Sequence, residues 1–241
     1  MDQLTGKELP GLFQAAAEKM AAHAEELGAM DAEMGDGDLG LTMNKGFGIL
    51  PETVRELAGE PVGKAVMKAG MKLSSVIPST MGCLMSSGLM TGGKAIGGAE
   101  AIGPTEYAAF LAGFAEGIVK RGKCKPGERT VLDAIHPAAE RAAAVLKENP
   151  GASLGEVAAA AEQAAHDGVE ATREMEPVYG KAAVHKAAAV GKADQGACAG
   201  WYLLQAFCEF IQGSRAYYET VVFRFYEFGL CLFRLPHPRA R

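Results

Sequence analysis

The sequence predicts an all-α fold, a bundle of about seven or eight helices in a single domain. Three observations support this prediction. Alanine-rich stretches dominate the chain, and Ala, Leu, Met, Glu and Lys lose little free energy on entering a helix. β-branched and aromatic residues are sparse before residue 215, where no alternating strand pattern is found. Clusters of glycine and proline separate the stretches, as expected for short connections between helices.

Two helices in the first half of the chain follow from apolar spacing and from a capping signal. Residues 11–30 repeat apolar side chains at intervals of three and four, which puts these side chains on one face of a helix. Residues 105–120 are predicted to form a helix that begins with Thr105 as its N-cap and carries Glu106 in its first turn.

The second half of the chain repeats the same composition. Ser153 and Glu156 have the spacing of a capping box, in which each side chain accepts a hydrogen bond from the other residue's backbone N–H. This predicts a helix over residues 153–174. Residues 130–147 and 195–212 are predicted to be helical because their composition and apolar spacing are alike.

The C-terminal part of the chain differs from the rest. Residues 214–241 contain seven aromatic residues and five arginines, and residues 219–235 are more typical of a strand than of a helix. We therefore divide the chain into a helical domain, residues 1–212, and an atypical extension, residues 213–241. The extension is a lineage-specific addition, an interaction segment or the product of a shifted reading frame.

The bulk composition excludes several classes of function. Hydrophobic residues make up 49% of the chain and charged residues 22%, which is enough for a core and argues against disorder. The net charge is −5 and no basic run occurs, so nucleic acid and anionic membranes are not expected partners. The five cysteines are scattered without a CxxC pair, which argues against a disulfide framework and against a zinc site. No secretory signal or membrane span is recognised, and a cytoplasmic protein is expected.

One motif carries recognisable chemistry. Residues 29–47, AMDAEMGDGDLGLTMNKGF, place Asp31, Asp36 and Asp38 at the end of a helix and in the glycine-rich turn after it. Crowded carboxylates repel one another unless a cation lies among them. Magnesium suits the cluster because it is a hard ion that prefers oxygen ligands and is completed by water and phosphate. The alternative interpretation is a solvated acidic turn that caps a helix.

Three better-known motifs fail in the same sequence. Residues 35–40 match the dinucleotide fingerprint GxGxxG but follow a predicted helix instead of a strand. Residues 88–95 nearly spell a P-loop, but Ala95 replaces the hydroxyl residue that would bind magnesium. A calcium-binding EF-hand starting at Asp36 would need an acidic residue where Phe47 stands.

Three further segments could approach a phosphate-containing ligand. Residues 74–88 supply hydroxyl groups and small residues, although a turn between packed helices would look the same. Residues 121–133 form a basic loop that leads into a helix start at Thr130, and an ordinary capped helix is the alternative. Residues 176–200 hold three lysines and an aspartate among small residues, which by themselves are more typical of a charged surface.

Taken together, these segments resemble the nucleotide-binding L subunit, or DAK2 domain, of dihydroxyacetone kinases. The resemblance extends over roughly residues 10–212, and the order and spacing of its four motifs agree. The motifs are Asp31 with GDGDLG at 35–40 and NKGF at 44–47, the segment 73–84, RGK at 121–123 with GERTVLD at 127–133, and GKA at 180–182 with GKADQGA at 191–197.

The resemblance implies an eight-helix antiparallel barrel with a nucleotide, ADP or ATP, at one end. It implies that Asp31, Asp36 and Asp38 bind two Mg2+ ions that bridge the phosphates. The residues that it assigns to the phosphate side are Leu39, Gly40, Leu41, Thr42, Thr80, Met81 and Gly82. The other residues that it assigns to the nucleotide are Gly122, Thr130, Val131, Lys181, Asp194 and Gly196.

The resemblance also implies a division of labour between subunits. The ketose, dihydroxyacetone or a relative, would be held covalently by a histidine of a separate K subunit, and this chain would supply the phosphoryl group. Its catalytic contribution is then limited to positioning and charge neutralisation, so none of its own five histidines is assigned as a base. The donor is either exchangeable ATP or a resident ADP that a phosphotransferase-system protein rephosphorylates. A second copy of the chain is a further candidate partner.

Several positions depart from the family pattern. Leu39 replaces a histidine, Pro78 and Ser79 replace a glycine pair, Lys181 replaces an arginine and Gln195 replaces a proline. These changes leave two alternatives to the kinase subunit. One is a non-catalytic ADP-binding regulatory module that docks a transcription factor or a kinase partner. The other is a helical scaffold that no longer binds a nucleotide.

Overall fold

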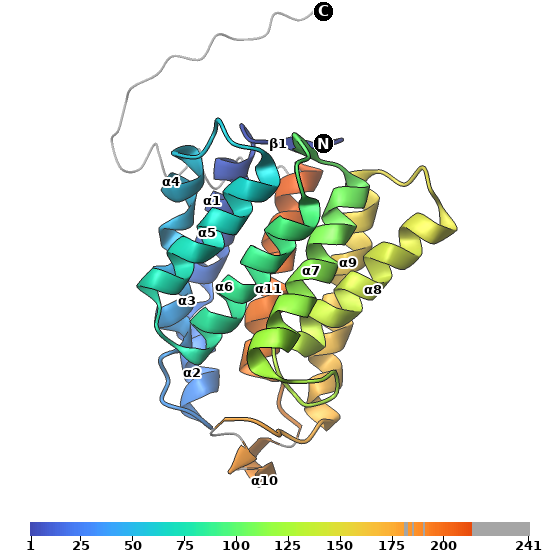
Figure 1. Ribbon diagram of the computed structural model, residues 1–241. Coiled ribbons are helices and arrows are strands. Elements are labelled where there is room, and N and C mark those ends of the chain that lie inside the picture. The colour runs from blue at the N-terminus through green and yellow to red at the C-terminus, as the bar shows by residue number, and fades with distance from the viewer. Residues whose placement is uncertain (181–182, 185, 190, 214–241) are drawn as a thin grey trace, which may run out of the picture.

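The structure, a computed structural model, describes residues 1–180, 183–184, 186–189 and 191–213 (Figure 1). Its elements are β1 (Leu4–Thr5), α1 (Leu9–Ala22), α2 (Ala24–Ala32), α3 (Leu39–Gly48), α4 (Leu50–Arg55), α5 (Val62–Val76), α6 (Thr80–Ile96), β2 (Ala101–Ile102), α7 (Pro104–Gly122), α8 (Leu132–Glu148), α9 (Leu154–Ala171), the 3-10 helix η1 (Thr172–Glu174), α10 (Lys186–Ala189) and α11 (Gln195–Gln212). The predicted all-α fold is confirmed. The strand-like segment predicted at 219–235 lies outside the described residues, as does the rest of the extension from residue 214 on.

The helices form a closed ring in chain order. A single residue separates α1 from α2, and another separates α3 from α4, so each pair forms one bent rod. Each rod then contacts the next along the chain, and α11 packs back against α1 and closes the ring. Together with α5 to α9 and α11, the bent rods give eight rods in the described chain, with the one-turn α10 outside them (Figure 1). The barrel that the family resemblance implies is therefore present.

The predicted helix over residues 11–30 is wrong in one respect, because it breaks at His23. The backbone of His23 leaves the helical region at φ −102° and ψ 11°. Its ring stacks on Tyr202 with 3.8 Å between ring centroids, and its Nδ1 lies 2.8 Å from Oε2 of Glu26. Tyr202 also donates to Glu26 over 2.9 Å. The break is therefore held by contacts with α11, which a local pattern cannot reveal.

The remaining helix boundaries follow the capping chemistry. The Ser153–Glu156 capping box is confirmed, and each residue's backbone N–H reaches the other's side chain. Thr105 as the N-cap of α7 is wrong, because Gly103 is the cap and Glu106 accepts from its N–H over 3.0 Å. Pro104 explains the shift, since proline is favoured at the first helical position. Within residues 74–88 only 77–79 lie outside helices, so most of that predicted loop is helical.

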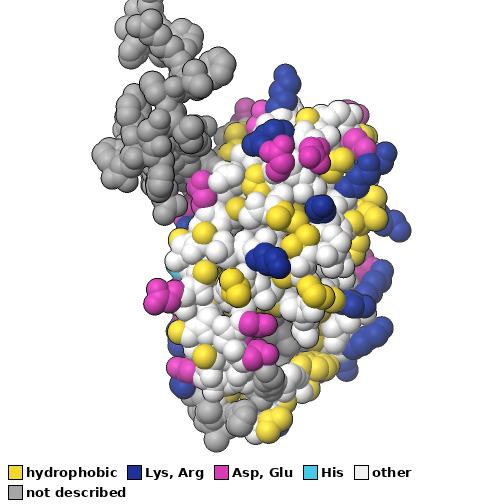
Figure 2. Space-filling view, turned by 90° about the vertical axis from the view of Figure 1, so that its left-hand side faces the viewer, with side chains coloured by type: hydrophobic (Ala, Val, Ile, Leu, Met, Phe, Trp, Pro, Cys, Tyr) yellow, Lys and Arg dark blue, Asp and Glu magenta, His cyan; other side chains and the backbone are white. Residues whose placement is uncertain are grey.

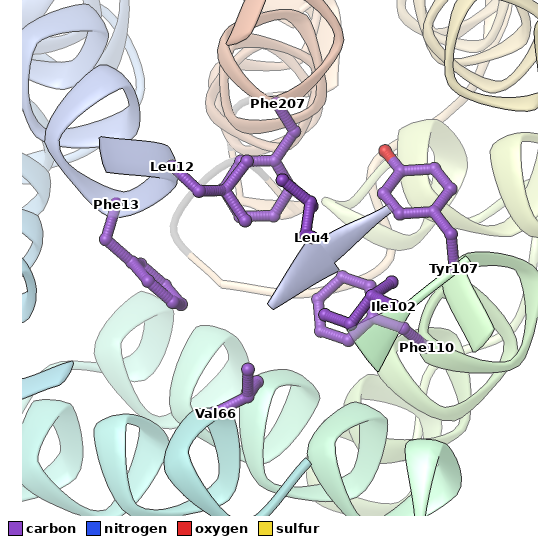
Figure 3. A pocket seen from close by; sticks show the side chains of 8 residues that line it. All are labelled: Leu4, Leu12, Phe13, Val66, Ile102, Tyr107, Phe110 and Phe207. Carbon is purple, nitrogen blue, oxygen red and sulfur yellow. The ribbon is translucent and has the colours of Figure 1, made fainter. Parts of the chain in front are cut away.

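The end of the barrel that carries the N-terminus is closed by apolar side chains. Leu4 of β1 lies opposite Ile102 of β2, and both are buried. Figure 3 shows these two side chains over Phe110 and Phe207. The cavity that they line measures only about 10 Å³, room for at most one water molecule. A ligand of useful size must therefore bind elsewhere.

The opposite end of the barrel carries another set of connections. The segments between α2 and α3, α5 and α6, α7 and α8, and α9 and α11 all lie there (lower end in Figure 1). Every described residue that the sequence analysis assigned to a ligand lies in one of these connections or in a helix end next to it. The false P-loop at 88–95 lies inside α6, which confirms that it was rightly rejected.

Candidate functional site

Asp31, Asp36 and Asp38 meet at this lower end of the barrel. Asp31 belongs to the last turn of α2, Asp36 lies in the connection, and Asp38 is the N-cap of α3. Each offers one carboxylate oxygen, and these oxygens lie within 4.8 Å of one another. Repulsion makes such crowding costly without a cation, whereas a hard divalent ion takes several oxygen ligands at close range. The donor set therefore fits Mg2+.

Two glycines allow the carboxylates to come together. Gly37 has a φ of +75°, in the left-handed region that side chains other than glycine rarely adopt. A Cβ atom on Gly35 would lie only 2.4 Å from Oδ1 of Asp31. The GDGD turn is thus required by the geometry of the cluster.

Asp31 is the enclosed member of the cluster, with 9% of its surface exposed. The backbone N–H of Leu39 lies 3.4 Å from its Oδ2, and Nε2 of Gln195 lies 3.4 Å from its Oδ1. The first residues of α3 and of α11 therefore both approach this carboxylate, and α11 becomes a wall of the site.

Ion pairs at Asp31 and Asp38 are absent from the described residues. In the part of the chain that the structure describes, neither carboxylate pairs with a lysine or arginine. On the face drawn in Figure 2, lysine and arginine side chains gather along one edge of the molecule. Two lysines of α5, Lys64 and Lys68, pair with Glu60. The negative charges of Asp31 and Asp38 thus remain available for a cation.

The α3 residues predicted on the phosphate side point in different directions. Leu39, Gly40 and Thr42 are buried, whereas Leu41 is 71% exposed. Gly40 packs so closely on α2 that an added Cβ would lie 1.7 Å from the carbonyl oxygen of Ala24. Gly40 is therefore needed for helix packing, whatever else it does.

The N-termini of α6, α8 and α11 converge beside the acidic cluster. A Cβ on Gly196 would lie 3.0 Å from Cε of Met81 and 3.4 Å from the backbone N of Val131. These residues belong to the first turn of α11, the first turn of α6 and the residue before α8. Helix N-termini carry partial positive charge and unpaired N–H groups, which favour phosphate. The structure thus brings together three of the predicted nucleotide segments.

The start of α6 also shows which amides remain available. Ser79 is its N-cap, and its Oγ accepts from the N–H of Gly82 over 3.0 Å. The N–H of Cys83 bonds to the carbonyl of Ser79. Among the described residues, the amides of Thr80 and Met81 donate to no protein group. These two amides, and not that of Gly82, are the available donors.

The remaining predicted residues are distributed around the same end. Gly122, the last residue of α7, packs on Leu84, and a Cβ there would approach its Cδ2 to 2.9 Å. Thr130 is half-buried, and its Oγ1 accepts from the N–H of Leu132. Asp194 is 5% exposed. Lys181 lies outside the described residues, so its assignment stays a prediction.

Asp194 is engaged with the protein itself. Its Oδ2 accepts from the N–H of Ala197 over 2.8 Å and caps α11. Its own N–H donates to Oγ1 of Thr172, and Arg129 lies 3.7 Å from its Oδ1. Burial raises the pKa of the Asp194 carboxyl to about 6, while the Ala197 amide and the Arg129 guanidinium act in the opposite direction. The Asp194 carboxylate therefore stabilises the N-terminus of α11 next to the site.

Sequence reasoning missed two buried charged residues here, Arg129 and Asp133. Asp133 accepts from the N–H groups of Gly127 and Thr130, at 2.5 and 2.7 Å, and so fixes the turn before α8. The three-residue spacing from Thr130 to Asp133 could have revealed this contact, since an acid at that spacing commonly reaches back to a helix start. Nothing in the sequence marked Arg129.

A separate cavity of about 350 Å³ lies behind residues 33–38, which we call the acidic loop. It opens between α2, α9 and α11, and it contains none of the residues predicted to bind Mg2+ or nucleotide. Its lining residues are Glu26, Met30, Glu33, Met34, Val169, Glu170, Arg173, Lys192, Ala193, Cys198, Trp201 and Tyr202. The nucleotide prediction therefore rests on the barrel end and not on this cavity.

None of the helices in the described residues combines the length and the apolar character needed to cross a membrane. Among curated proteins, the chain is 26% identical over 185 residues to the ADP-binding subunit of the PEP-dependent dihydroxyacetone kinase of Escherichia coli. That match covers 77% of this chain and 87% of the relative. It is also 33% identical over 193 residues to human triokinase/FMN cyclase, covering 78% of this chain and 32% of that protein.

Solved structures show the same fold. The crystal structure of the dihydroxyacetone kinase from C. freundii in complex with AMP-PNP and Mg2+ matches with a TM-score of 0.61 and 23% identity. The match covers 83% of this chain and 33% of that one, so the chain spans about a third of its length. The DAK2 domain family matches residues 33–209, which include the acidic loop and all the converging helix ends. The chain belongs to the DAK2 domain family.

Proposed function

We propose that this chain binds ADP or ATP through two Mg2+ ions at the lower end of the barrel. We further propose that it is the nucleotide-binding subunit of a dihydroxyacetone-type kinase. The observation that carries the proposal is the cluster of three carboxylates, with oxygens within 4.8 Å, next to converging helix N-termini. Carboxylates would hold a divalent cation, and helix N-termini would attract phosphate groups next to it.

The proposed roles follow from what each group can donate. Asp31, Asp36 and Asp38 hold the ions, which when bound supply neutralisation of the phosphate charge. The amides of Thr80 and Met81 donate to phosphate oxygens, since within the described residues they donate to no protein group. The other proposed nucleotide contacts are Leu39, Gly40, Leu41, Thr42, Gly82, Gly122, Thr130, Val131, Lys181 and Gly196. Asp194 acts indirectly, because its carboxylate already caps α11.

The proposed reaction is phosphoryl transfer to dihydroxyacetone or a related ketose that is held by a separate K-type subunit. Two relatives support this division. The E. coli relative, named as an ADP-binding subunit, is covered over 87% of its length, whereas the human triokinase is covered over 32%. The ketose site would then belong to the part that this chain does not match. Analytical ultracentrifugation with and without a K-type subunit would test this pairing and detect a homodimer.

Calorimetric titration tests the nucleotide site. Wild-type protein should bind ADP in the presence of Mg2+ and lose that binding when EDTA removes the ion. Asp36→Asn and Asp38→Asn should each abolish it, because the cluster loses a charged ligand. Asp167→Asn, an exposed carboxylate of α9 outside the cluster, is the matched control and should bind as wild type does. Equal binding by the cluster variants and the wild type would refute the metal assignment.

Phosphoryl transfer is tested separately. Mixed with a K-type subunit, the chain should phosphorylate dihydroxyacetone with ATP, or with a phosphotransferase-system donor when ADP stays bound. Mg2+–ADP binding without transfer to any K-type subunit would favour the regulatory module. A flat titration with folded protein would indicate a scaffold without nucleotide.

A further inference from the structure

A fully enclosed guanidinium lies beneath the proposed site. Arg129 is 3% exposed overall, and its side chain is completely covered. Its backbone has a φ of +59°, a conformation that residues other than glycine seldom adopt. Burying a charge is costly unless several groups compensate it, so the contacts of this side chain have to be substantial.

The guanidinium contacts two segments that are far apart in the sequence. Its Nη2 lies 3.1 Å from the carbonyl oxygen of Lys192 and 3.5 Å from those of Ala189 and Ala193. Its Nη1 lies 3.9 Å from Sδ of Met34, in the acidic loop. Ala189, Lys192, Ala193 and the acidic loop thus meet on one side chain.

The third contact is with the start of α11. Nη1 lies 3.7 Å from Oδ1 of Asp194, which is longer than a hydrogen bond and weaker than the contact with the Lys192 carbonyl. Arginine is suited to this place because its planar group presents several donors in a fixed fork, and the two N–H groups of Nη2 face three carbonyl oxygens. The contacts of Arg129 with the carbonyls of Ala189, Lys192 and Ala193 therefore do not depend on the charge of Asp194.

These contacts lie next to residues that are predicted to bind Mg2+ or the nucleotide. Met34 stands in sequence between Asp31 and Asp36, and Asp194 precedes Gln195, whose Nε2 approaches Asp31. Thr130 and Val131 directly follow Arg129 itself. Movement of the guanidinium would shift the acidic loop, the α8 start and the α11 start together.

We propose that Arg129 is a positioning residue of the nucleotide site, which sets the distance between the metal-binding loop and the N-terminus of α11. It touches neither metal nor nucleotide and acts through the carbonyls of Ala189, Lys192 and Ala193 and through Met34. The proposal rests on the proposed function for its effect on ligand affinity, but the contacts of Arg129 with Met34 and the three carbonyls are present without a ligand.

The decisive comparison is between Asp194→Asn and the double variant Arg129→Met with Asp194→Asn. Both lack the carboxylate charge, and asparagine is still a good N-cap, so their difference isolates the carbonyl contacts of Arg129. The double variant should bind Mg2+–ADP about tenfold or more weakly than Asp194→Asn, at a melting temperature within a few degrees. Affinities within about twofold in two folded proteins would overturn the proposal.

A conservative variant and a surface arginine complete the set. Arg129→Lys keeps the buried charge but reaches fewer carbonyls, so its affinity should lie between those of wild type and the double variant. Arg173→Met is the matched control, because Arg173 contacts the carbonyl of Gly191 over 3.3 Å from the exposed side. It should bind as wild type does. If the double variant does not fold, Arg129→Lys with wild-type affinity overturns the proposal.

Hydrogen exchange without ligand separates this proposal from the proposed function. In Arg129→Lys, peptides covering the acidic loop 33–38 and residues 191–194 should both exchange faster than in wild type. Peptides from α5 should be unchanged. This result would support the positioning role of Arg129 even if wild-type protein bound no nucleotide. Unchanged exchange in both regions would overturn that role.

Discussion

Gln195 and Asp31, which are 164 residues apart, meet at the lower end of the barrel, where Nε2 of Gln195 lies 3.4 Å from Oδ1 of Asp31. The amide also brings a cost. Its Oε1 is buried without a hydrogen-bond partner in the described part of the chain. Gln195 therefore orients a proposed metal ligand at the expense of an unsatisfied oxygen.

Replacing Gln195 with leucine should separate these two effects. Asp31 loses a donor, so the affinity for Mg2+ with ADP should fall about two- to tenfold, as expected for one modest hydrogen bond. Stability should stay level or rise slightly, because the unsatisfied oxygen is removed as well. Calorimetry and urea unfolding measure the two quantities. Gln163→Leu, on the exposed face of α9, is the control and should change neither. An unchanged affinity in Gln195→Leu would mean that the contact has no role.

Gly40→Ala should test the packing beneath the acidic loop. The new methyl group would lie 1.7 Å from the carbonyl oxygen of Ala24, so α2 and α3 must move apart. Overpacking of this kind should lower the free energy of unfolding by about 1–3 kcal/mol. Gly48→Ala in the same helix meets nothing within 4 Å and should be neutral or stabilising by up to about 1 kcal/mol. Urea unfolding of both variants decides the matter, and equal stabilities would contradict the close approach.

The acidic cluster could be predicted from the sequence because its residues are close together in the chain. Asp31, Asp36 and Asp38 lie within one helix end and one turn, and the glycines between them leave few other conformations. The helices were predicted for the same reason, since apolar spacing and caps are local. The boundaries of α11, residues 195–212, agree with the prediction, and Gly213 follows in the left-handed conformation that ends helices.

The contacts between distant segments could not be predicted. The break at His23 depends on stacking against Tyr202, 179 positions later, and the role of Arg129 depends on carbonyls some 60 positions away. No periodicity encodes such pairs. Asp194 illustrates the consequence, because the family pattern assigns it to the nucleotide, whereas its carboxylate caps α11 and faces Arg129.

The Asp194 carboxyl should make stability depend on pH. Its pKa is raised from 3.8 to about 6, chiefly by burial. Between these values the folded protein binds the proton more tightly than the unfolded chain, so this group's contribution to stability falls as pH rises from about 4 to 6. The loss should be on the order of 2–3 kcal/mol and complete above that range.

Asp194→Asn cannot titrate and serves as the reference. The free energy of unfolding of wild type minus that of the variant, measured by urea unfolding at several pH values, should decrease from about pH 4 to 6 and then level off. The remaining acids titrate in both proteins and cancel. A difference that is constant with pH, or that increases, would contradict the raised pKa.

Ser79→Ala should distinguish a cap that only stabilises from a cap that also shapes the site. Ser79 accepts from the N–H of Gly82 at the start of α6, and Ser153 accepts from the N–H of Glu156 at the start of α9. Removing either hydroxyl should lower the free energy of unfolding by about 1 kcal/mol. Only Ser79→Ala should also weaken Mg2+–ADP binding, because fraying of α6 displaces the amides of Thr80 and Met81. Ser153→Ala controls for lost stability, since α9 starts at the other end of the barrel. Equal affinities in the two variants would show that the α6 N-terminus does not hold the phosphates.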